Sequence, residues 1–493
     1  MIISSPQRNN SKFPSMAEQL HFLLVPLMSH SHISPLTDFA KLLARQGVFV
    51  SIVTTPLNAI RYKGVIDDAK AQNLRIQMIP IEFPCQEAGL PDGCESVEAL
   101  TSKKLARKFY RACELLIEGP LEQLIQELKP KPSCIVSSNA IPWTSKVAKK
   151  FNIPNYNFEP GSCFTLLCDH NIRAHLQESV VSDFEPFLVP DIPHEIEFTK
   201  PQLPGSTTAK DSDDSDHVNQ VNQVRNSARA ILMNSFEELE PWYLDGCRKI
   251  YGKVWCVGSF TLCKKEVSER SDRSNKAASI DGHHCLAWLD SMKPKSVIYA
   301  CFGSLSRISL GQIKEIGLGL EAANFPFIWV IRKQDYSAEV EKWLAEDRLE
   351  ERVRERGLII RGWADQVLIL SHPSVGGFLT HCGWNSTLEG VCAGVPMVTW
   401  PMCADQFYNE RFIVNVLEIG VSVNNSGKSE DLVKWDKVKR AIEDLMDGGS
   451  EVGRMRRKRA EAVAKMASKA AEKGGSSYLN VTMLIHDVLE QVQ

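Results

Sequence analysis

Two histidines lie two residues apart near the N-terminus, just after an apolar run. The stretch LVPLMSHSHISP (24–35) carries His30 and His32. An H-x-H pair could ligate a metal ion, or one imidazole could act as a general base, because histidine titrates near neutral pH. Both could equally be loop residues without a chemical role. The pair alone leaves these three interpretations open.

A second candidate site lies in the C-terminal half, in HCGWNSTLEGVCAGVP (381–396). An apolar run ends at His381, and the pattern predicts that a helix begins near Asn385 or Ser386. Ser386 and Glu389 match the S-x-x-E capping box, which gives both a structural interpretation. The free N–H groups and dipole of a helix N-terminus are also typical of a phosphate site. Spacing alone favours neither interpretation.

The residues around the first candidate predict a strand–helix–strand unit from residue 20 to 55. LHFLLVPL is continuously apolar, as in a strand that is covered on both faces. Ser34 and Pro35 suit the N-cap and first position of the following helix, and VFVSIVTT forms the second strand. His30 and His32 are therefore expected in a loop at the carboxyl end of a strand, where ligands bind in open α/β sheets.

Further apolar stretches predict two groups of strands on either side of a polar segment. Residues 263–282 contain almost no large apolar side chains and suit a linker. The acidic stretch 209–217 suggests a mobile loop. The predicted strands lie at 75–81, 134–138, 154–158 and 230–235 in the first group and at 296–302, 326–332, 357–361, 376–381 and 395–401 in the second. Two α/β halves of this kind imply a cleft between them.

Length and composition narrow the class of protein. A chain of 493 residues is too long for one core, so we expect at least two domains. The net charge of -3 gives no reason to expect nucleic acid or an anionic membrane as partner. Residues 1–19 lack the apolar core of a signal peptide, and residues 20–28 are too short to span a bilayer. The 14 cysteines include no C-x-x-C pair, which suits a reducing compartment, so we expect a cytoplasmic protein.

The stretch from residue 363 to 406, which begins WADQ and ends CADQ, resembles the signature box of plant secondary-product glycosyltransferases. These are family-1 enzymes that depend on UDP-sugars. TKPQLP (199–204), NSFEELEP (234–241) and WLDSMKPKSVIYACFGSL (288–305) fit the same family. The resemblance implies an α/β GT-B fold, in which two Rossmann-like doubly wound domains face each other across a cleft. The nucleotide sugar would bind to the C-terminal domain and the acceptor to the N-terminal one.

The resemblance and the composition together predict five segments. They are a flexible N-terminus (1–19), an acceptor-binding domain (20–258), a linker (259–283), a UDP-sugar-binding domain (284–475) and a C-terminal helix (476–493) that could pack back on the N-terminal domain.

The resemblance assigns the nucleoside to residues at the start of the box. Trp363 would stack on uracil, with an ordinary buried aromatic as the alternative. Ala364, through its backbone, and Gln366 would meet the edge of the base and ribose. Glu389 would accept hydrogen bonds from the ribose hydroxyls.

The resemblance also assigns the diphosphate and the sugar. Ser304, His381, Asn385 and Ser386 would hold the diphosphate and stabilise the charge that grows on it as the sugar departs. Such donors replace a metal, so we expect neither a metal nor a cofactor, with UDP-glucose as the co-substrate. Trp384, Asp405 and Gln406 would hold the sugar hydroxyls. A glutamine at the end of the box is typical of glucose donors.

Alignment on Pro26 and Pro35 places the family's catalytic histidine at His32, with His30 in place of the usual glutamine. His32 would remove the proton from the acceptor hydroxyl, and in-line attack would invert the anomeric carbon. The family usually has an aspartate that orients this histidine, in a stretch like C-I-V-S-D. Here the stretch is CIVSSNAIPW, and Ser138 takes that position. A serine can orient an imidazole but cannot offset the charge of imidazolium.

These observations predict inverting transfer of glucose from UDP-glucose to a hydroxyl or carboxyl of a small lipophilic plant metabolite. The N-terminal half most resembles the clade that acts on triterpenoids, steroids and flavonoids, and we expect a monomer without an integral membrane segment. Ser138 leaves a non-catalytic sugar-nucleotide-binding protein as the alternative. A metal-dependent hydrolase that uses His30 and His32 would need further ligands at later strand ends, and the histidines at positions 170, 194 and 217 do not supply that pattern.

Overall fold

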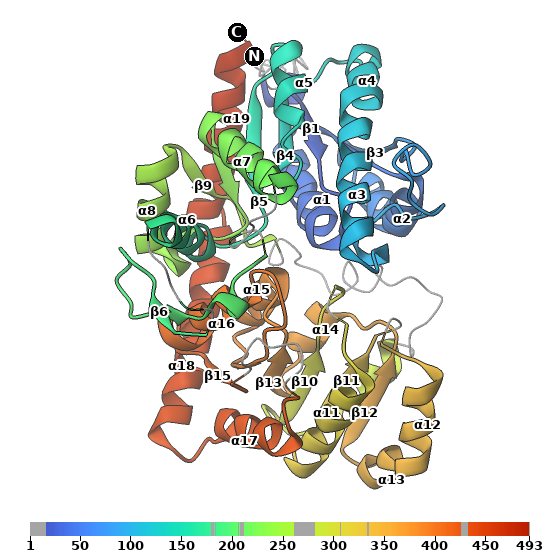
Figure 1. Ribbon diagram of the computed structural model, residues 1–493, viewed down its shortest axis with the longest axis vertical. Helices are drawn as coiled ribbons and strands as arrows, with labels where there is room; N and C mark the ends of the chain where they lie inside the picture. The colour runs from blue at the N-terminus through green and yellow to red at the C-terminus, as the bar shows by residue number, and fades with distance from the viewer. Residues whose placement is uncertain are drawn as a thin grey trace, which may run out of the picture.

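The computed structural model describes residues 16–178, 182, 184–205, 207, 212–260, 282–305, 307–332, 335–424 and 432–492. Each half of the chain is built around a parallel β-sheet (Figure 1). Most of the predicted flexible N-terminus and of the predicted linker lies outside the described residues. Within the former, Met16–Gln19 forms a short 3-10 helix, η1.

The N-terminal sheet has the strand order β3-β2-β1-β4-β5-β8-β9, and all its neighbouring strands are parallel. Its strands follow the apolar runs, and every residue of β1 is buried, as expected for a strand with both faces covered. The order reverses between β1 and β4, so the topological switch point lies between them. The strands are β1 (His21–Val25), β2 (Phe49–Thr54), β3 (Ile76–Pro80), β4 (Cys134–Ser138), β5 (Asn155–Glu159), β8 (Ile231–Met233) and β9 (Val254–Cys256).

The C-terminal sheet repeats this arrangement with the order β12-β11-β10-β13-β14-β15, again parallel. Its switch point lies between β10 and β13. The strands are β10 (Val297–Cys301), β11 (Phe327–Ile331), β12 (Gly357–Arg361), β13 (Val375–Thr380), β14 (Met397–Thr399) and β15 (Gly420–Ser422), and a separate hairpin joins β6 (Phe187–Leu188) to β7 (Glu197–Phe198). The prediction of two Rossmann-like α/β domains is confirmed.

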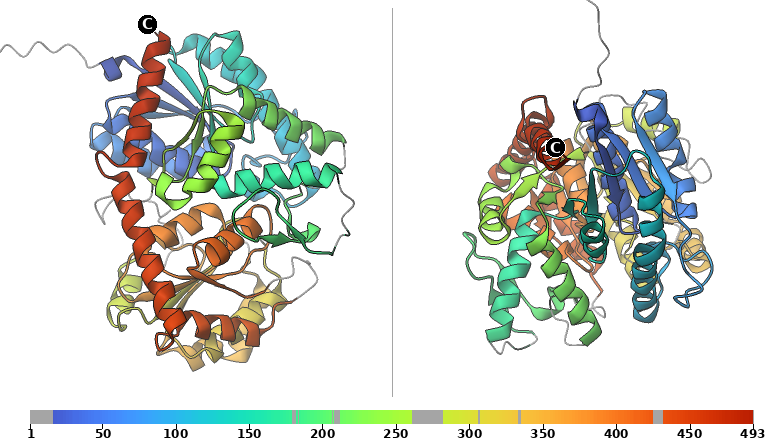
Figure 2. Two further views of the ribbon diagram at one scale, coloured as in Figure 1. Left: turned by 90° about the vertical axis from the view of Figure 1, so that its left-hand side faces the viewer. Right: turned by 90° about the horizontal axis from the view of Figure 1, so that it is seen from above.

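Helices cover the sheets of both halves (Figure 2). Those of the N-terminal half are α1 (His30–Arg45), α2 (Pro56–Ala71), α3 (Lys103–Leu116), α4 (Glu122–Glu127), α5 (Thr144–Lys150), α6 (Cys163–Glu178), α7 (Ser212–Ser227) and α8 (Pro241–Tyr251). Those that follow are α10 (Gly282–Asp290), α11 (Leu310–Ala322), α12 (Ala338–Asp347), α13 (Leu349–Val353), α14 (Gln366–Leu370), α15 (Trp384–Ala393), α16 (Gln406–Arg411), α17 (Trp435–Met446), α18 (Glu451–Ala471) and α19 (Ser476–Val492).

The acidic stretch 209–217 differs from its prediction. We expected a mobile loop, but α7 begins at Ser212, so most of the stretch is helical. Acidic residues are favourable at a helix N-terminus because they complement the positive end of the helix dipole. The acidic residues therefore favour the start of α7 at this point in the chain.

The last helix packs on the N-terminal domain. The chain crosses back along one side of the molecule through α18 and α19 (Figure 2). Leu484 and Val488 are fully buried in the same cluster as Phe22 of β1. Asp487 accepts a hydrogen bond of 2.6 Å from the hydroxyl of Tyr156 in β5. The C-terminal segment therefore ties the two halves together.

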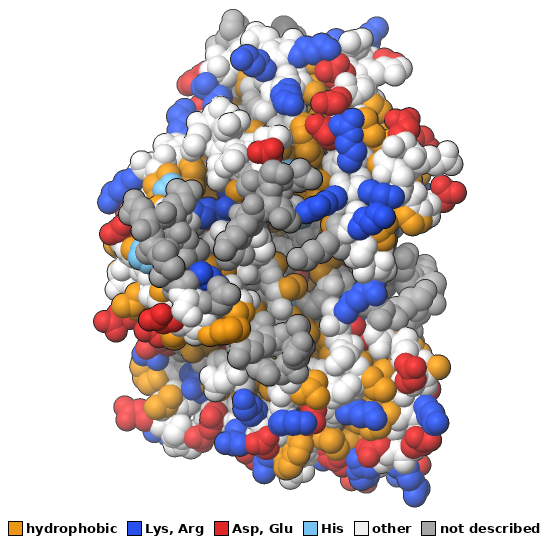
Figure 3. Space-filling view, in the orientation of Figure 1, with side chains coloured by type: hydrophobic (Ala, Val, Ile, Leu, Met, Phe, Trp, Pro, Cys, Tyr) orange, Lys and Arg blue, Asp and Glu red, His pale blue; other side chains and the backbone are white. Residues whose placement is uncertain are grey.

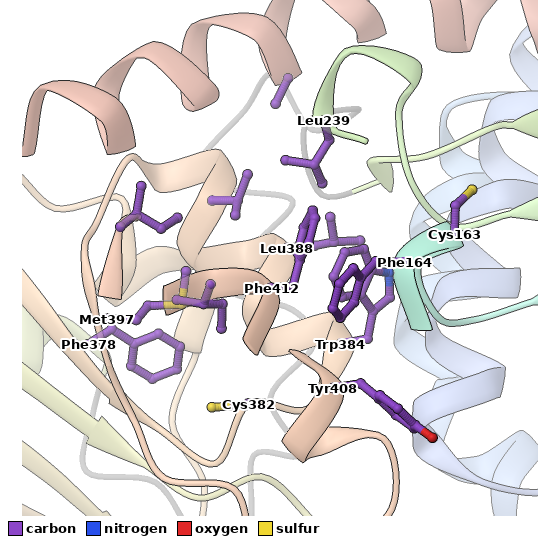
Figure 4. Close-up of a cluster of buried hydrophobic side chains, with 14 of the residues drawn as sticks. Cys163, Phe164, Leu239, Phe378, Cys382, Trp384, Leu388, Met397, Tyr408 and Phe412 are labelled. Atoms are coloured by element: carbon purple, nitrogen blue, oxygen red, sulfur yellow. The ribbon is translucent and has the colours of Figure 1, made fainter. Parts of the chain in front are cut away.

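An apolar cluster also joins the two domains, as Figure 4 shows. Phe164 of α6 lies 5.2 Å, between ring centroids, from Phe412 of the C-terminal half. Trp384, the first residue of α15, lies 6.1 Å from the same ring. This packing fixes α15 against the N-terminal domain, which matters because α15 carries much of the predicted donor site.

The surface gives little further indication of a partner. Figure 3 shows acidic and basic side chains interspersed over the lower, C-terminal half in that view. In the part of the chain that the structure describes, no helix is both long and apolar enough to cross a membrane.

Candidate active site

His32 lies in the first turn of a helix, not in a loop. Helix α1 begins at His30 with Ser29 as its N-cap, so the predicted start at Ser34 and Pro35 is wrong. Pro35 lies inside the helix, in its second turn. His32 therefore lies in the first turn of the helix that follows β1, at the switch point of the N-terminal sheet.

A contact across the domain interface explains how the helix tolerates Pro35. Proline has no N–H, so the carbonyl of Ser31, four residues earlier, lacks its usual partner in the helix. Asn385 Nδ2, from α15, donates to this carbonyl at 3.0 Å. The other end of the same amide, Asn385 Oδ1, accepts from Asn234 Nδ2 at 3.2 Å, and the indole N–H of Trp384 donates to the carbonyl of Asn234 at 2.7 Å. These bonds hold the N-terminus of α15 against the turn that carries His32.

His32 and Ser138 form a hydrogen-bonded pair. Ser138 is the last residue of β4, on the other side of the switch point, and its Oγ lies 2.5 Å from Nδ1 of His32. When Nδ1 carries the proton and donates to Ser138, Nε2 keeps its lone pair and can act as a base. Burial lowers the pKa of His32 to about 4, and the negative charge of Glu98 opposes this shift. The imidazole is therefore neutral at physiological pH.

His30 has a different environment from His32. It is exposed, and its Nδ1 lies 2.7 Å from the hydroxyl of Tyr62 in α2. Nδ1 of His30 therefore contacts Tyr62 and Nδ1 of His32 contacts Ser138, so the two rings are not directed at a common ligand. Among the described residues, no group of three or more His, Cys, Asp or Glu side chains is placed to hold a metal ion.

His381 lies directly after β13, at the switch point of the C-terminal sheet. Gly303, after β10, and Gly383 both lie against it, and a Cβ atom at these positions would be 2.2 Å and 2.5 Å from its Nε2. Only glycine therefore fits at either position. Burial and the nearby positive charge of Arg332 lower the pKa of His381 to about 3, so the ring is neutral. Its buried Nδ1 has no hydrogen-bond partner among the described residues.

Arg332, which was not among the predicted site residues, fixes the loop opposite His381. Its Nη1 donates to the carbonyls of Phe302 and Gly303, at 2.9 and 2.6 Å, and its Nε donates to Asp335 at 2.5 Å. The half-buried Ser304 follows this pinned segment. The one signal in the sequence was an arginine at the end of an apolar strand, which alone is weak.

Trp363, Gln366, Ser386 and Glu389 gather around the start of α14. The side chain of Trp363 is 41% exposed, so the alternative of an ordinary buried aromatic is wrong. Gln366 Nε2 donates to Ser386 Oγ at 2.9 Å and to Glu389 Oε2 at 2.6 Å. The neighbouring Ala364 is half-buried against the core. An exposed indole thus lies next in the chain to a polar patch that includes a carboxylate.

The capping-box interpretation of Ser386 and Glu389 is wrong. Helix α15 begins at Trp384 with Gly383 as its N-cap, three residues before Ser386, the N-cap that this interpretation requires. Both side chains therefore lie within the helix and face Gln366 instead of the helix N-terminus.

The side chains of Trp384, Asp405 and Gln406, the three predicted sugar-binding residues, contact other parts of the protein. The indole of Trp384 packs in the domain interface (Figure 4). Gln406 is buried, and its Oε1 accepts from the N–H groups of Met402 and Cys403, at 2.8 and 3.1 Å. Asp405 accepts from Asn409 at 2.9 Å, and burial raises the pKa of its carboxyl. The side chains of Asp405 and Gln406 thus brace their own loop.

The fold and the site together define a class. Two Rossmann-like domains, each with polar side chains at its switch point and joined by α15 at the first turn of α1, form a GT-B glycosyltransferase. A family model described as UDP-glucoronosyl and UDP-glucosyl transferase matches residues 275–450.

Similar proteins identify the family. UDP-glycosyltransferase 73C3 of Arabidopsis thaliana is 46% identical over 489 residues, which cover 96% of this chain and 97% of that protein. UDP-glycosyltransferase 73C9 of Barbarea vulgaris is 44% identical, with 98% and 99% covered. The solved structure of Glycyrrhiza uralensis UGT73P12 with glycyrrhetinic acid 3-O-monoglucuronide superposes with a TM-score of 0.86 at 34% identity and 96% coverage of each chain. The chain belongs to the plant family-1 UDP-glycosyltransferases, which use a UDP-sugar as co-substrate and act on small plant metabolites.

Proposed function

We propose that this enzyme transfers glucose from UDP-glucose to a hydroxyl or carboxyl of a lipophilic plant metabolite, with inversion at the anomeric carbon. The observation that carries the proposal is the His32–Ser138 pair, which lies beside the interface with α15. A neutral, oriented imidazole next to the nucleotide-sugar domain is the arrangement that base-assisted transfer requires.

The proposed step moves one proton and exchanges one bond. Nε2 of His32 takes the proton of the acceptor hydroxyl while the acceptor oxygen forms a bond to the anomeric carbon. The bond from that carbon to the diphosphate breaks, and its electron pair leaves on UDP. His32 becomes imidazolium, with Nδ1–H held by Ser138, and later returns the proton to solvent. Attack opposite to the leaving group converts an α-linked donor into a β-linked product.

The donor would lie along α15 and α14. Trp363 is exposed enough to stack on uracil, and Glu389 would accept from the ribose hydroxyls. The unpartnered Nδ1 of His381, with Ser304 and Ser386, would meet the diphosphate. Asn385 would reach the diphosphate only by giving up its bond to Ser31 or by sharing it. The sugar would meet the backbone N–H of Trp384 because the indole is turned into the interface.

The proposed choice of glucose and of acceptor rests on resemblance. Gln406 ends the signature box, where the resemblance makes a glutamine typical of glucose donors. Medicago truncatula UGT71G1 was solved with UDP-glucose, and its structure superposes with a TM-score of 0.76 at 25% identity and covers 96% of this chain and 99% of its own. The glycyrrhetinic acid glucuronide bound to the Glycyrrhiza relative supports a triterpenoid acceptor, with steroids and flavonoids in the same clade.

Transfer can be tested with a panel of acceptors. The purified protein is incubated with UDP-glucose and glycyrrhetinic acid, cholesterol or quercetin, and products are identified by mass spectrometry. We expect a mass gain of one hexose with at least one acceptor and a β anomeric proton coupling by NMR. UDP binding without transfer to any member of the panel would favour the non-catalytic alternative, and an α-linked product would contradict inversion.

Replacing Ser138 with aspartate is expected to raise the pKa of His32, because a carboxylate beside the ring stabilises imidazolium. Only the neutral imidazole acts as base, so activity is lost as pH falls through this pKa. The acid limb of kcat/KM is expected near pH 4 in the natural protein, since burial lowers the pKa of His32 to about 4. In Ser138→Asp it should move up by roughly 1–2 pH units, and kcat with an alcohol acceptor should rise at pH 8.

The neutral variant Ser138→Asn is the matched control, because it has the size of aspartate without the charge. Its acid limb should stay at or below that of the natural protein. Equal pH profiles for the two variants would show that charge at this position does not act on the base.

A further inference from the structure

We infer that Glu98 is a positioning residue that supplies the negative charge missing at Ser138 and stabilises the imidazolium form of His32 during transfer. This inference rests on the proposed role of His32 as the general base. It goes beyond that role because it assigns the charge compensation to a residue on another segment, far from the signature box.

Glu98 caps the helix that carries His32. The side chain of Ser29, the N-cap of α1, accepts no capping hydrogen bond from a backbone N–H of the helix, although its Oγ lies 2.9 Å from Oγ of Ser31. Instead, Glu98 Oε1 accepts from the backbone N–H of His30 at 2.7 Å and from Ser29 Oγ at 2.8 Å. A residue distant in the chain thus takes the place that the N-cap side chain usually occupies.

The segment that carries Glu98 is docked on this turn. Glu98 is the middle residue of a short 3-10 helix, η2 (Val97–Ala99), and the N–H of Val97 donates to the carbonyl of Met28 at 2.9 Å. This bond lies one residue before the N-cap of α1. Together with the two bonds of the carboxylate, it fixes η2 against the turn between β1 and His32.

The charge is needed because of where His32 lies. The N-terminus of a helix carries partial positive charge, which disfavours imidazolium in its first turn. Ser138 contacts the ring but is neutral, His30 on the same turn is paired with the neutral Tyr62, and Asn385, which contacts this turn from α15, is also neutral. Glu98 is the charged group that acts on His32 and raises its pKa. The carboxylate of Glu98 at this helix end therefore offsets both the positive end of the helix dipole and the positive charge that develops on His32.

The second oxygen of the carboxylate is free for this role. Glu98 Oε2 is buried and has no hydrogen-bond partner among the described residues. Arg61 and Glu95 line the same pocket as Glu98, but Glu98 forms none of the ion pairs found in the described part of the chain. The negative charge of Glu98 thus acts on the first turn of α1.

The test replaces Glu98 with glutamine, which keeps an oxygen to accept from His30 but removes the charge. With the best alcohol acceptor from the panel, kcat at pH 7.5 should fall roughly three- to tenfold, with KM for UDP-glucose unchanged. A phenol acceptor should lose less, because it gives up its proton more readily. Thermal unfolding of each variant is measured in parallel.

Glu95→Gln is the matched control. Glu95 lies in the same segment and caps α2, with its Oε2 accepting from the N–H of Leu57 at 2.9 Å. The Glu95→Gln variant removes the same charge from the N-terminus of a neighbouring helix and should leave kcat unchanged.

Rescue by a second carboxylate separates charge from structure. In the Ser138→Asp background, Glu98→Gln should cost less than twofold in kcat, since the introduced aspartate would then compensate the imidazolium. In this background, Glu98→Gln should also lower the pH of the acid limb of kcat/KM, which Ser138→Asp has raised into a range that can be measured. The inference is overturned if Glu98→Gln leaves kcat unchanged, or if its cost is equal in both backgrounds. Loss of activity in His32→Ala with full activity in Glu98→Gln would leave the proposed base standing and reject only Glu98.

Discussion

Replacing His32 with alanine is expected to lower kcat about 10²- to 10⁴-fold, the usual contribution of a general base. The reason is that Nε2 of His32 is the one proposed acceptor for the proton of the attacking hydroxyl. UDP binding should stay within about twofold of the natural protein, because the ring contacts Ser138 and not the donor residues of α14 and α15. Initial rates with saturating donor and a calorimetric titration with UDP measure the two effects separately.

His30→Ala is the control for this variant. His30 is on the same turn but exposed and paired with Tyr62, so its removal should cost far less in kcat. A His32→Ala variant that turns over at the natural rate would reject the base assignment. A variant that loses UDP binding to the same extent as activity would place His32 in the donor site instead.

Replacing Trp363 with alanine is expected to weaken UDP binding by roughly 1–3 kcal/mol, the value of one base stacked on an aromatic ring. This corresponds to an increase of about 5- to 150-fold in Kd. Because stacking on uracil is the same before and during transfer, kcat at saturating UDP-glucose should change little. The indole is 41% exposed, so its removal creates no large core cavity.

Trp435→Ala is a matched control, since that indole is 43% exposed and lies at the start of α17. Its Kd for UDP should equal that of the natural protein. Trp363→Phe should keep part of the affinity. An unchanged Kd for UDP in Trp363→Ala would move the uracil site away from this residue.

The sequence predicted the strands better than the helix ends. Runs such as LHFLLVPL are apolar because both faces of a parallel strand are covered, and this signal is local. The start of α1 was misjudged because Pro35 usually marks a first helical position. Its tolerance inside the helix depends on Asn385, which is distant in the chain and contributed by the other domain.

The candidate site was predicted through resemblance, and its long-range partners were not. Ser138 was expected beside His32, and the two are in hydrogen-bond contact. Arg332, Asn234 and Glu98 act through bonds to segments that are far away in sequence, and no spacing rule links them to the box. Such contacts appear only when the fold brings strand ends and helix starts together.

A crystal structure with UDP-2-fluoro-glucose and an acceptor from the panel would be the decisive test of the proposed site. We predict uracil stacked on Trp363, the diphosphate at His381, and Nε2 of His32 within hydrogen-bond distance of the attacking hydroxyl. A donor bound away from Trp363 and His381, or an acceptor hydroxyl out of reach of His32, would contradict this prediction.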